Sequence, residues 1–237
     1  MKRNVMLFVG LLVTAGMAAA ADSKPNALTA EEKVAGWKLL FNGANFEGWR
    51  GYRMTGLPES GWEINDGLLK TVPKAKGKEL ITVDKYDDFE LSWEWKVAPA
   101  GNNGVKYFVT EDRPGAPGHE YQMIDDESNA DGKLGLHHAT AAFYDVLPAP
   151  AERPLRKAGE WNQSRILVQG NHVEHWLNGK KVLGFELGSE AVKAGLAKSK
   201  FAKYPDFGTK IQGHIMLTYH NDECWYRSIK IRPLPAR

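Results

Sequence analysis

The segment Phe89-Glu-Leu-Ser-Trp-Glu-Trp-Lys-Val97 alternates apolar and polar residues with a period of two. Side chains of a β-strand point alternately to opposite faces of the sheet, so the pattern predicts a half-buried strand. Trp93 and Trp95 are two residues apart, which places both on one face and assigns them to a core. The rest of the chain repeats this kind of signal.

Short strand signals separated by turn residues lie on both sides of this segment. They cover residues 37–41, 62–64, 68–72, 80–83, 105–110, 120–124, 143–146, 161–169, 173–177, 181–187, 213–219 and 224–231. No βαβ alternation occurs, so the sequence predicts an all-β sandwich or barrel. We expect residues 105–110 to pair with 89–97 across the turn 99–104.

Two short helices are expected among these strands. Thr29-Ala-Glu-Glu32 matches a capping box, so a helix should begin there and end near Gly36. Ser189 can cap a second helix that runs to Lys200.

The first residues have the three-part plan of a secretory signal peptide. Lys2 and Arg3 precede an apolar run at 5–13, and Ala18-Ala-Ala-Ala21 fits a cleavage site. The run is shorter than the roughly 20 apolar residues that span a bilayer, so no transmembrane segment is expected, although a retained anchor is the alternative. We expect residues 1–21 to be a signal peptide, 22–34 a leader and 35–237 a single domain.

The charge and the cysteine count narrow the partners and the compartment. Removing residues 1–21 lowers the formal charge from +2 to 0, because Lys2 and Arg3 leave without any acid. No clustered basic face and no nucleic-acid partner are therefore expected. Cys224 is the only cysteine, so an internal disulfide is excluded and a bacterial periplasm is favoured for an exported chain. Its apolar neighbours indicate a buried residue rather than a nucleophile.

The segment Glu120-Tyr-Gln-Met-Ile-Asp125 carries the most informative polar pattern. Strand alternation places Glu120 and Gln122 on one face, with Tyr121 and Met123 on the core side. A carboxylate beside an amide suits the vicinal hydroxyls of a sugar, although a solvated polar face has the same pattern. Glu120 and Asp125 are also candidates for sugar hydrolysis by paired carboxylates, but their opposite strand directions count against it.

Histidines and acids supply further candidates. The histidines at 137, 138, 175 and 220 are potential general bases or metal ligands. Asp125-Asp126-Glu127 with Asn129 and Asp131 offers oxygens that suit a divalent metal such as calcium. The spacing matches no established metal loop, and an exposed acidic turn is the alternative, so no cofactor is assigned. No nucleophile elbow and no P-loop support covalent serine or phosphate chemistry.

Further short motifs follow one another in a characteristic order. They are Trp37-Lys-Leu-Leu-Phe-Asn-Gly43, Phe46-Glu-Gly-Trp49, Trp62-Glu-Ile-Asn-Asp-Gly67, Asp88-Phe-Glu-Leu91, Gly101-Asn-Asn-Gly104, Glu120-Tyr-Gln122 with Asp125, Gly159-Glu-Trp-Asn162, His175-Trp-Leu-Asn-Gly179, Gly213-His-Ile-Met-Leu217 with His220, and Tyr226-Arg-Ser-Ile229. In this order and spacing they resemble the 3-keto-disaccharide hydrolase family, also catalogued as domain of unknown function 1080. The match runs from about residue 35 to 234.

The resemblance implies a concanavalin A-like jelly-roll β-sandwich of two sheets with a concave sugar-binding face. It also implies action on 3-keto-disaccharides or related glycosides, as a 3-keto-glucoside 1,2-lyase and 3-keto-2-hydroxyglucal hydratase with net hydrolysis. A ketone at C3 acidifies the proton on C2. A base removes that proton, the enolate expels the group on C1, and water adds back. A sugar 3-dehydrogenase acting upstream is an implied partner.

The resemblance also carries roles onto matching residues. Glu120, Asp125 and His220 are the expected catalytic residues, with His220 the first choice as acid/base. The expected substrate-binding residues are Gln122, Arg227, Asn103, Tyr144, His137 and Lys106. Arg227 is expected to stabilise the enolate. Asn103 stands where many members have Ser, and Thr218 stands where many have Gln.

Two other function classes stay open at this level. A lectin-like carbohydrate-binding module without catalysis would have the same fold, and it predicts sugar binding without turnover. A general surface interaction protein predicts neither binding nor turnover.

Overall fold

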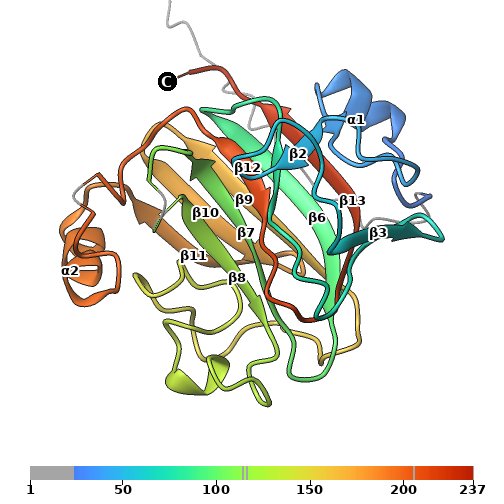
Figure 1. Ribbon diagram of the computed structural model, residues 1–237. Coiled ribbons are helices and arrows are strands. Elements are labelled where there is room, and N and C mark those ends of the chain that lie inside the picture. The colour runs from blue at the N-terminus through green and yellow to red at the C-terminus, as the bar shows by residue number, and fades with distance from the viewer. Residues whose placement is uncertain (1–23, 114, 116, 205, 237) are drawn as a thin grey trace, which may run out of the picture.

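The computed structural model describes residues 24–113, 115, 117–204 and 206–236, and it has two antiparallel β-sheets packed face to face (Figure 1). The predicted all-β, two-sheet jelly-roll sandwich with two short helices is therefore confirmed. The expected signal peptide at residues 1–21 lies outside the described residues. Among those that are described, no helix is long and apolar enough to cross a membrane.

The larger sheet has eight strands, in the order β11-β10-β9-β6-β13-β4-β3, with β1 also paired to β13. These strands are β1 (Lys38–Leu39), β3 (Trp62–Asn65), β4 (Leu68–Thr71), β6 (Phe89–Val97), β9 (Asn162–Gln169), β10 (His172–Leu177), β11 (Lys180–Glu186) and β13 (Cys224–Pro233). The smaller sheet has five strands in the order β2-β5-β12-β7-β8. They are β2 (Trp49–Gly51), β5 (Leu80–Thr82), β7 (Asn102–Val109), β8 (His119–Ile124) and β12 (His214–Leu217).

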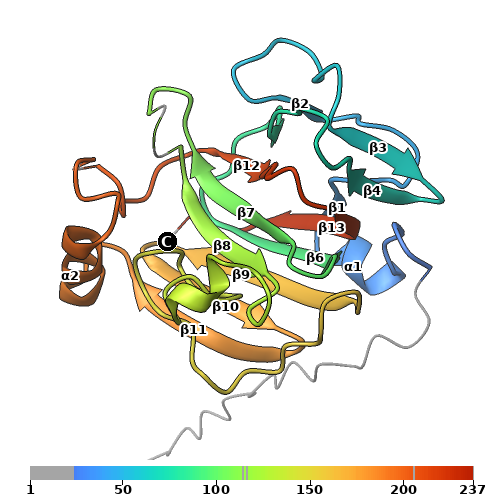
Figure 2. The same cartoon turned by 60° about the horizontal axis from the view of Figure 1, so that its bottom comes forward.

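Both predicted helices are present. In α1 (Ala30–Val34), the Thr29 hydroxyl accepts from the backbone N–H of Glu32, and the Glu32 carboxylate accepts from the N–H of Thr29. Ser189 caps α2 (Glu190–Lys198), which stands beside the sandwich in both views (Figures 1 and 2). A short 3₁₀ helix, η1 (Gly132–Leu134), lies in the long segment between β8 and β9.

The predicted pairing of residues 105–110 with 89–97 is wrong. β6 pairs with β9 and β13 in the larger sheet, whereas β7 pairs with β8 and β12 in the smaller one. The backbone N–H of Ala100 donates to the Asp125 carboxylate at 2.8 Å, and the N–H of Asp125 donates to Gly101 O at 2.9 Å. These bonds hold the connection against the end of β8, so the chain crosses to the other sheet instead of turning back.

Two strand assignments also differ from expectation. Residues 143–146 form no strand, and Phe143 makes only isolated bridges to Tyr121 and Leu147. β2 carried no strand signal, because its three residues follow a turn-rich stretch.

The core lies between the sheets and contains both tryptophans of β6, as predicted. The rings of Trp93 and Tyr121 meet edge to face with centroids 5.1 Å apart. Trp95 Nε1 donates to Ser164 Oγ at 2.8 Å, and Ser164 Oγ donates to Tyr121 Oη at 2.9 Å. Tyr121 Oη in turn donates to the backbone carbonyl of Trp176 at 3.0 Å. This chain of hydrogen bonds joins β8 to the opposite sheet, so Tyr121 faces the core as expected.

Cys224 is fully buried, as its sequence neighbours indicated. Burial raises the pKa of its thiol above the ordinary value. The thiol is therefore held in its unreactive protonated form.

Candidate functional site

Glu120 and Gln122 lie on the outer face of the smaller sheet, because Tyr121 and Met123 occupy its inner face. Glu120 pairs in register with Lys106 of β7, and Lys106 Nζ lies 3.4 Å from Glu120 Oε2. Glu120 is only 6% exposed, so its charge is largely removed from water and Lys106 is the counter-charge beside it. The predicted neighbours Glu120, Gln122 and Lys106 are thus brought together.

The carboxylate of Glu120 lies across β7 where that strand has a glycine. A Cβ added to Gly104 would overlap Glu120 Oε1 and would lie 3.0 Å from both Cγ and Cδ. The backbone of Gly104 is otherwise ordinary, with no positive φ. Gly104 is therefore needed for the space above it rather than for its own conformation.

Tyr144 joins these residues from the segment that follows β8. Its backbone N–H donates to Glu120 O at 3.1 Å, and its hydroxyl donates to Asp131 Oδ2 at 2.9 Å. Burial, the Asp131 hydrogen bond and the charges of Asp131, Glu120 and Asp145 raise the pKa of Tyr144 above its ordinary value. The phenol therefore stays protonated near neutral pH. We call Glu120, Gln122, Lys106 and Tyr144 the Glu120 cluster.

Asp131 and His138 support Tyr144 from behind. His138 Nδ1 lies 2.8 Å from Asp131 Oδ1, and His138 Nε2 lies 3.4 Å from Asp145 Oδ1. The His138 and Tyr144 rings meet with centroids 4.9 Å apart. The neighbouring His137, which was expected to bind substrate, is exposed, and its role stays a prediction. The adjacent pair of histidines was a signal for a site, but in an irregular segment no periodicity decides which of the two points inward.

Asp125 is occupied by its own backbone surroundings. Its Oδ2 accepts from Ala100 N, and its Oδ1 accepts from Glu127 N and Ser128 N. Burial opposes ionisation, but these backbone hydrogen bonds hold the pKa of Asp125 below its ordinary value. A carboxylate in this state is a poor proton acceptor, so the geometry favours a turn-forming role over the expected catalytic one.

His220 lies in the segment that follows β12. The N–H of Thr218 donates to Gly104 O at 3.0 Å, which brings the end of β12 alongside the glycine beneath Glu120. His220, two residues later, is exposed. Within the described part of the chain its ring has no hydrogen-bond or ion-pair partner, so it is available to a ligand.

Two expected substrate contacts lie elsewhere. Arg227 is on β13 next to the core residue Tyr226, so it faces away from the smaller sheet. It pairs there with Glu94 at 3.0 Å and stacks 4.2 Å from the ring centre of Trp161. The two sheets separate it from Glu120, so the expectation that it stabilises an enolate beside Glu120 is not supported.

Asn103 points to the core side of β7, because it pairs with the core residue Met123. It is fully buried, and its Oδ1 accepts from Tyr226 Oη and from Thr218 Oγ1, both at 2.8 Å. It therefore joins the two sheets inside the core, on the opposite side of β7 from the face that carries Glu120.

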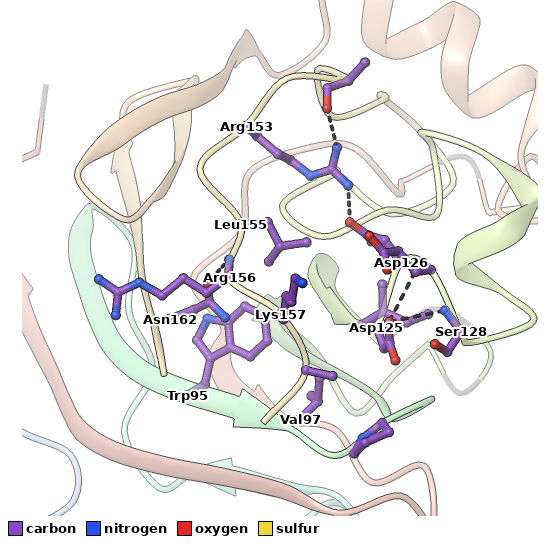
Figure 3. A pocket seen from close by; sticks show the side chains of 15 residues that line it. Trp95, Val97, Asp125, Asp126, Ser128, Arg153, Leu155, Arg156, Lys157 and Asn162 are labelled. Atoms are coloured by element: carbon purple, nitrogen blue, oxygen red, sulfur yellow. Dashed lines mark hydrogen bonds and ion pairs between the residues drawn. The ribbon is translucent and has the colours of Figure 1, made fainter. Parts of the chain in front are cut away.

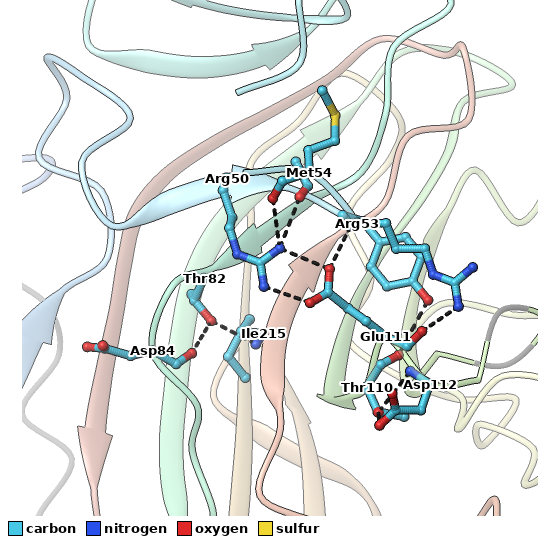
Figure 4. Close-up of polar contacts among 11 residues, drawn as sticks. Arg50, Arg53, Met54, Thr82, Asp84, Thr110, Glu111, Asp112 and Ile215 are labelled. Carbon is cyan, nitrogen blue, oxygen red and sulfur yellow. Dashed lines mark hydrogen bonds and ion pairs between the residues drawn. The ribbon is translucent and has the colours of Figure 1, made fainter. Parts of the chain in front are cut away.

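A second polar group lies at the far side of the same outer face (Figure 4). The register runs from Lys106 through Met216 and Ile81 to Arg50, so Arg50 lies roughly 19 Å from Glu120 at about 4.8 Å per strand. The Arg50 guanidinium donates to both oxygens of Glu111, at 2.9 and 2.8 Å, and Arg53 N–H donates to Glu111 Oε1 at 2.7 Å. The hydrogen bonds from Arg50 lower the pKa of Glu111 to about 2, against the opposing effect of burial.

Comparisons with known proteins place the chain in a family. The family model of the 3-keto-alpha-glucoside-1,2-lyase-like domain matches residues 36–232. A 3-keto-disaccharide hydrolase of Bacteroides thetaiotaomicron is 33% identical over an alignment of 232 positions, which covers 84% of this chain and 79% of that protein. This chain belongs to the 3-keto-alpha-glucoside-1,2-lyase-like family.

Two solved structures of this type come from Parabacteroides distasonis, and both are provisionally described as glycosyl hydrolases. One has a TM-score of 0.79 and 35% identity, covering 90% of this chain and 100% of its own. The other has a TM-score of 0.66 and 29% identity, covering 84% and 99%. Membership of the lyase-like family supports an enzyme over a binding module without catalysis.

No residues of this lyase-like domain that the structure describes form a group of three or more His, Cys, Asp or Glu side chains able to hold a metal ion. The acidic stretch 125–131, considered as a calcium site, is divided among other partners. Asp125 bonds backbone N–H groups, Asp126 pairs with Arg153, and Asp131 bonds Tyr144 and His138. Its geometry is that of a folded turn.

A pocket of about 370 Å³ lies between the end of β6, the turn after β8 and the segment before β9 (Figure 3). Trp95 and Val97 of β6 line it from the core side, and Leu155 and Lys157 line it from the segment before β9. Asp125 is on its wall, with both oxygens already bonded. The Glu120 cluster is not among its lining residues.

Replacing Gly104 with Ala should displace the Glu120 carboxylate without unfolding the sandwich. The overlapping atoms are the end of a flexible side chain, so Glu120 can move aside. Misplacing a reacting group by about 1 Å costs up to about 100-fold in rate. We therefore expect turnover of a 3-keto-disaccharide to fall 10- to 100-fold, with a small change in Tm. Gly184→Ala in β11, whose Cβ would meet nothing closer than 3.9 Å, is the matched control. Unchanged turnover in Gly104→Ala would contradict this role.

Replacing Glu111 with Gln should make the free energy of unfolding depend less on pH in the acid range. The pKa of Glu111 is about 2 in the folded protein and about 4.3 when unfolded. Its contribution is therefore present above pH 4.3 and is lost as the pH falls towards 2. We expect the variant to lose about 1 kcal/mol at pH 7, as for a partly exposed ion pair, and almost nothing near pH 2.5.

Denaturant unfolding at the two pH values measures this difference. The exposed Glu59, changed to Gln, is the control and should show no pH-dependent loss. An equal loss for Glu111→Gln at both pH values would show that lost packing, rather than charge, is responsible.

Proposed function

We propose that this protein cleaves glycosides oxidised to a ketone at C3, by elimination across C1 and C2 followed by hydration. Membership of the lyase-like family and the resemblance to a 3-keto-disaccharide hydrolase support this substrate class. The observation that carries the proposal is the Glu120 carboxylate, 6% exposed, beside Lys106 and the protonated Tyr144. A base beside a cation suits proton abstraction next to a carbonyl group, while the Tyr144 hydroxyl, whose hydrogen is donated to Asp131, offers its oxygen as an acceptor for a sugar hydroxyl.

Each step then has a residue of the site to perform it. Glu120 takes the proton from C2, and the electron pair moves into the C2–C3 bond and onto the ketone oxygen. Lys106 is the nearest cation to that developing charge, and Gln122 holds a hydroxyl. When the enolate expels the C1 oxygen, His220 donates the proton that completes the released alcohol. Water then adds across the C1–C2 double bond: its hydroxyl bonds to C1, its other proton restores His220, and Glu120 delivers to C2 a proton that has exchanged with solvent, so the net reaction is hydrolysis.

Replacing Glu120 with Gln tests this assignment. General-base catalysis contributes about 10²- to 10⁴-fold, so we expect at least a 100-fold loss of turnover on a 3-keto-disaccharide, with the fold intact. Glu127→Gln, an exposed acid on the following turn, is the control and should be unaffected. In D₂O the wild type should place deuterium on C2 of the sugar product at its turnover rate.

Two results would overturn the proposal. One is release of product without deuterium at C2, which would indicate direct hydrolysis. The other is wild-type turnover in Glu120→Gln. The parent disaccharide with a C3 hydroxyl is the substrate control and should not be cleaved, because its C2 proton is not acidified.

We also propose that the protein is exported to a bacterial periplasm. The supporting features are Lys2 and Arg3, the apolar run at 5–13, the alanines at 18–21 and the single cysteine. A sugar 3-dehydrogenase acting upstream would supply the ketone that the reaction requires. N-terminal sequencing of protein from the producing bacterium should find a start near Ala21 or Asp22. A start at Met1 in the cytoplasmic fraction would contradict export.

A further inference from the structure

A fully buried histidine of the larger sheet reaches across the core to the segment that carries Tyr144. His175 lies on β10, and its Nδ1 is 3.0 Å from Ala141 O while its Nε2 is 3.1 Å from Tyr107 Oη. β8 lies over β9 and β10 in both views (Figures 1 and 2), so this contact joins the two sheets behind the Glu120 cluster.

The partners of the ring fix its protonation pattern. A carbonyl oxygen only accepts, so Nδ1 carries the hydrogen, and Nε2 accepts from the Tyr107 hydroxyl. Burial lowers the pKa of His175 to about 4, against the opposing effect of the Ala141 bond, so the ring is neutral at neutral pH. Both ring nitrogens are thus used, and both bonds cross the core from β10, one to Tyr107 of β7 and the other to the segment beside β8.

Ala141 is held in a conformation that needs support. Its φ is 69°, in the left-handed region that a non-glycine residue occupies only at an energetic cost. Its N–H donates to Gln122 O at 2.9 Å, and its carbonyl accepts from His175. One bond ties it to β8 and the other ties it to the opposite sheet, and these two bonds determine its position.

The same segment places Tyr144 three residues later. Phe143 bridges to Tyr121 and stacks on Phe185 with ring centroids 5.2 Å apart. The Tyr144 N–H then donates to Glu120 O. The contacts therefore run without a break from His175 through Ala141 to Tyr144. Along this segment, the N–H groups of Ala141 and Tyr144 donate to the backbone carbonyls of Gln122 and Glu120 in β8.

We propose that His175 is a positioning residue of the Glu120 cluster, acting through its hydrogen bond to Ala141 to hold Tyr144 beside Glu120. This rests on the proposed function for its kinetic consequence only, since the effect on the segment 139–144 is structural and can be measured without substrate. His175 itself contacts neither the outer face nor a substrate.

Two replacements separate the two hydrogen bonds of the ring. In His175→Asn the side-chain amide nitrogen occupies the Nδ1 position, so it keeps the bond to Ala141 and loses Tyr107. In His175→Gln the amide reaches the Nε2 position, so it keeps Tyr107 and loses Ala141. Tyr107→Phe removes the Tyr107 bond alone and is the matched control.

We expect His175→Gln to lower kcat at least 10-fold per folded molecule with KM changed less than 3-fold, and to speed amide exchange in residues 141–144. His175→Asn and Tyr107→Phe should keep kcat within about 3-fold of wild type, with slow exchange. Equal kcat losses in the Asn and Gln variants, or wild-type kcat and slow exchange in His175→Gln, would overturn the proposal.

Two further measurements keep the test decisive. If His175→Gln does not fold, ¹H–¹⁵N spectra of the wild type should show the Nδ1–H tautomer of His175, protected from exchange, and the Nε2–H tautomer would overturn the proposal. If wild type has no turnover on 3-keto-disaccharides, the proposed function fails, whereas the exchange rates in the Asn and Gln variants still decide the role of His175.

Discussion

The sandwich and its candidate site depend on the burial of Tyr121 in β8. Its ring packs edge to face on Trp93, and its hydroxyl links Ser164 to Trp176 in the opposite sheet. Burying an aromatic ring with a satisfied hydroxyl is strongly favourable, so this face of β8 cannot turn outward without losing the core. Because alternate side chains face opposite ways, the same burial holds Glu120 and Gln122 on the outer face.

A nearly buried carboxylate is stable there only because its surroundings are adapted to it. Gly104 leaves room above β7, Lys106 provides the counter-charge, and the segment 139–144 covers the edge of β8. Removing a charge from water is expensive unless it is paired, so the ion pair with Lys106 is what allows this carboxylate to be buried. The buried carboxylate therefore costs folding stability, and it is also the group to which we assign proton abstraction in the proposed reaction.

The errors in the sequence-based expectations have two physical origins. The first is that contacts between residues far apart in the sequence decide which sheet a strand joins and which face a side chain takes. This accounts for the wrong pairing of residues 105–110 with 89–97 and for the roles expected of Arg227 and Asn103. Asp125 holds the β6–β7 connection against β8, and Tyr226 turns Arg227 to the opposite outer face. The second is that the irregular segment after β8 has no repeating pattern that assigns side chains to a face. Only the folded structure therefore shows that His138, rather than His137, contacts Asp131 and Tyr144, and that Asp131 bonds the Tyr144 hydroxyl.

The sequence by itself determined the all-β class, both capped helices, the core positions of Trp93, Trp95, Tyr121 and Met123, and the outward direction of Glu120 and Gln122. Each of these follows from local hydrogen bonding or from the two-residue period of a strand, which neighbouring residues set. The tertiary structure alone decided which strands share a sheet, that Lys106 and Tyr144 meet Glu120 while Arg227 does not, and that His175 reaches Ala141 through the core. Those outcomes depend on register and on contacts between residues far apart in the chain, and a one-residue shift in register would reverse the face of every side chain in a strand.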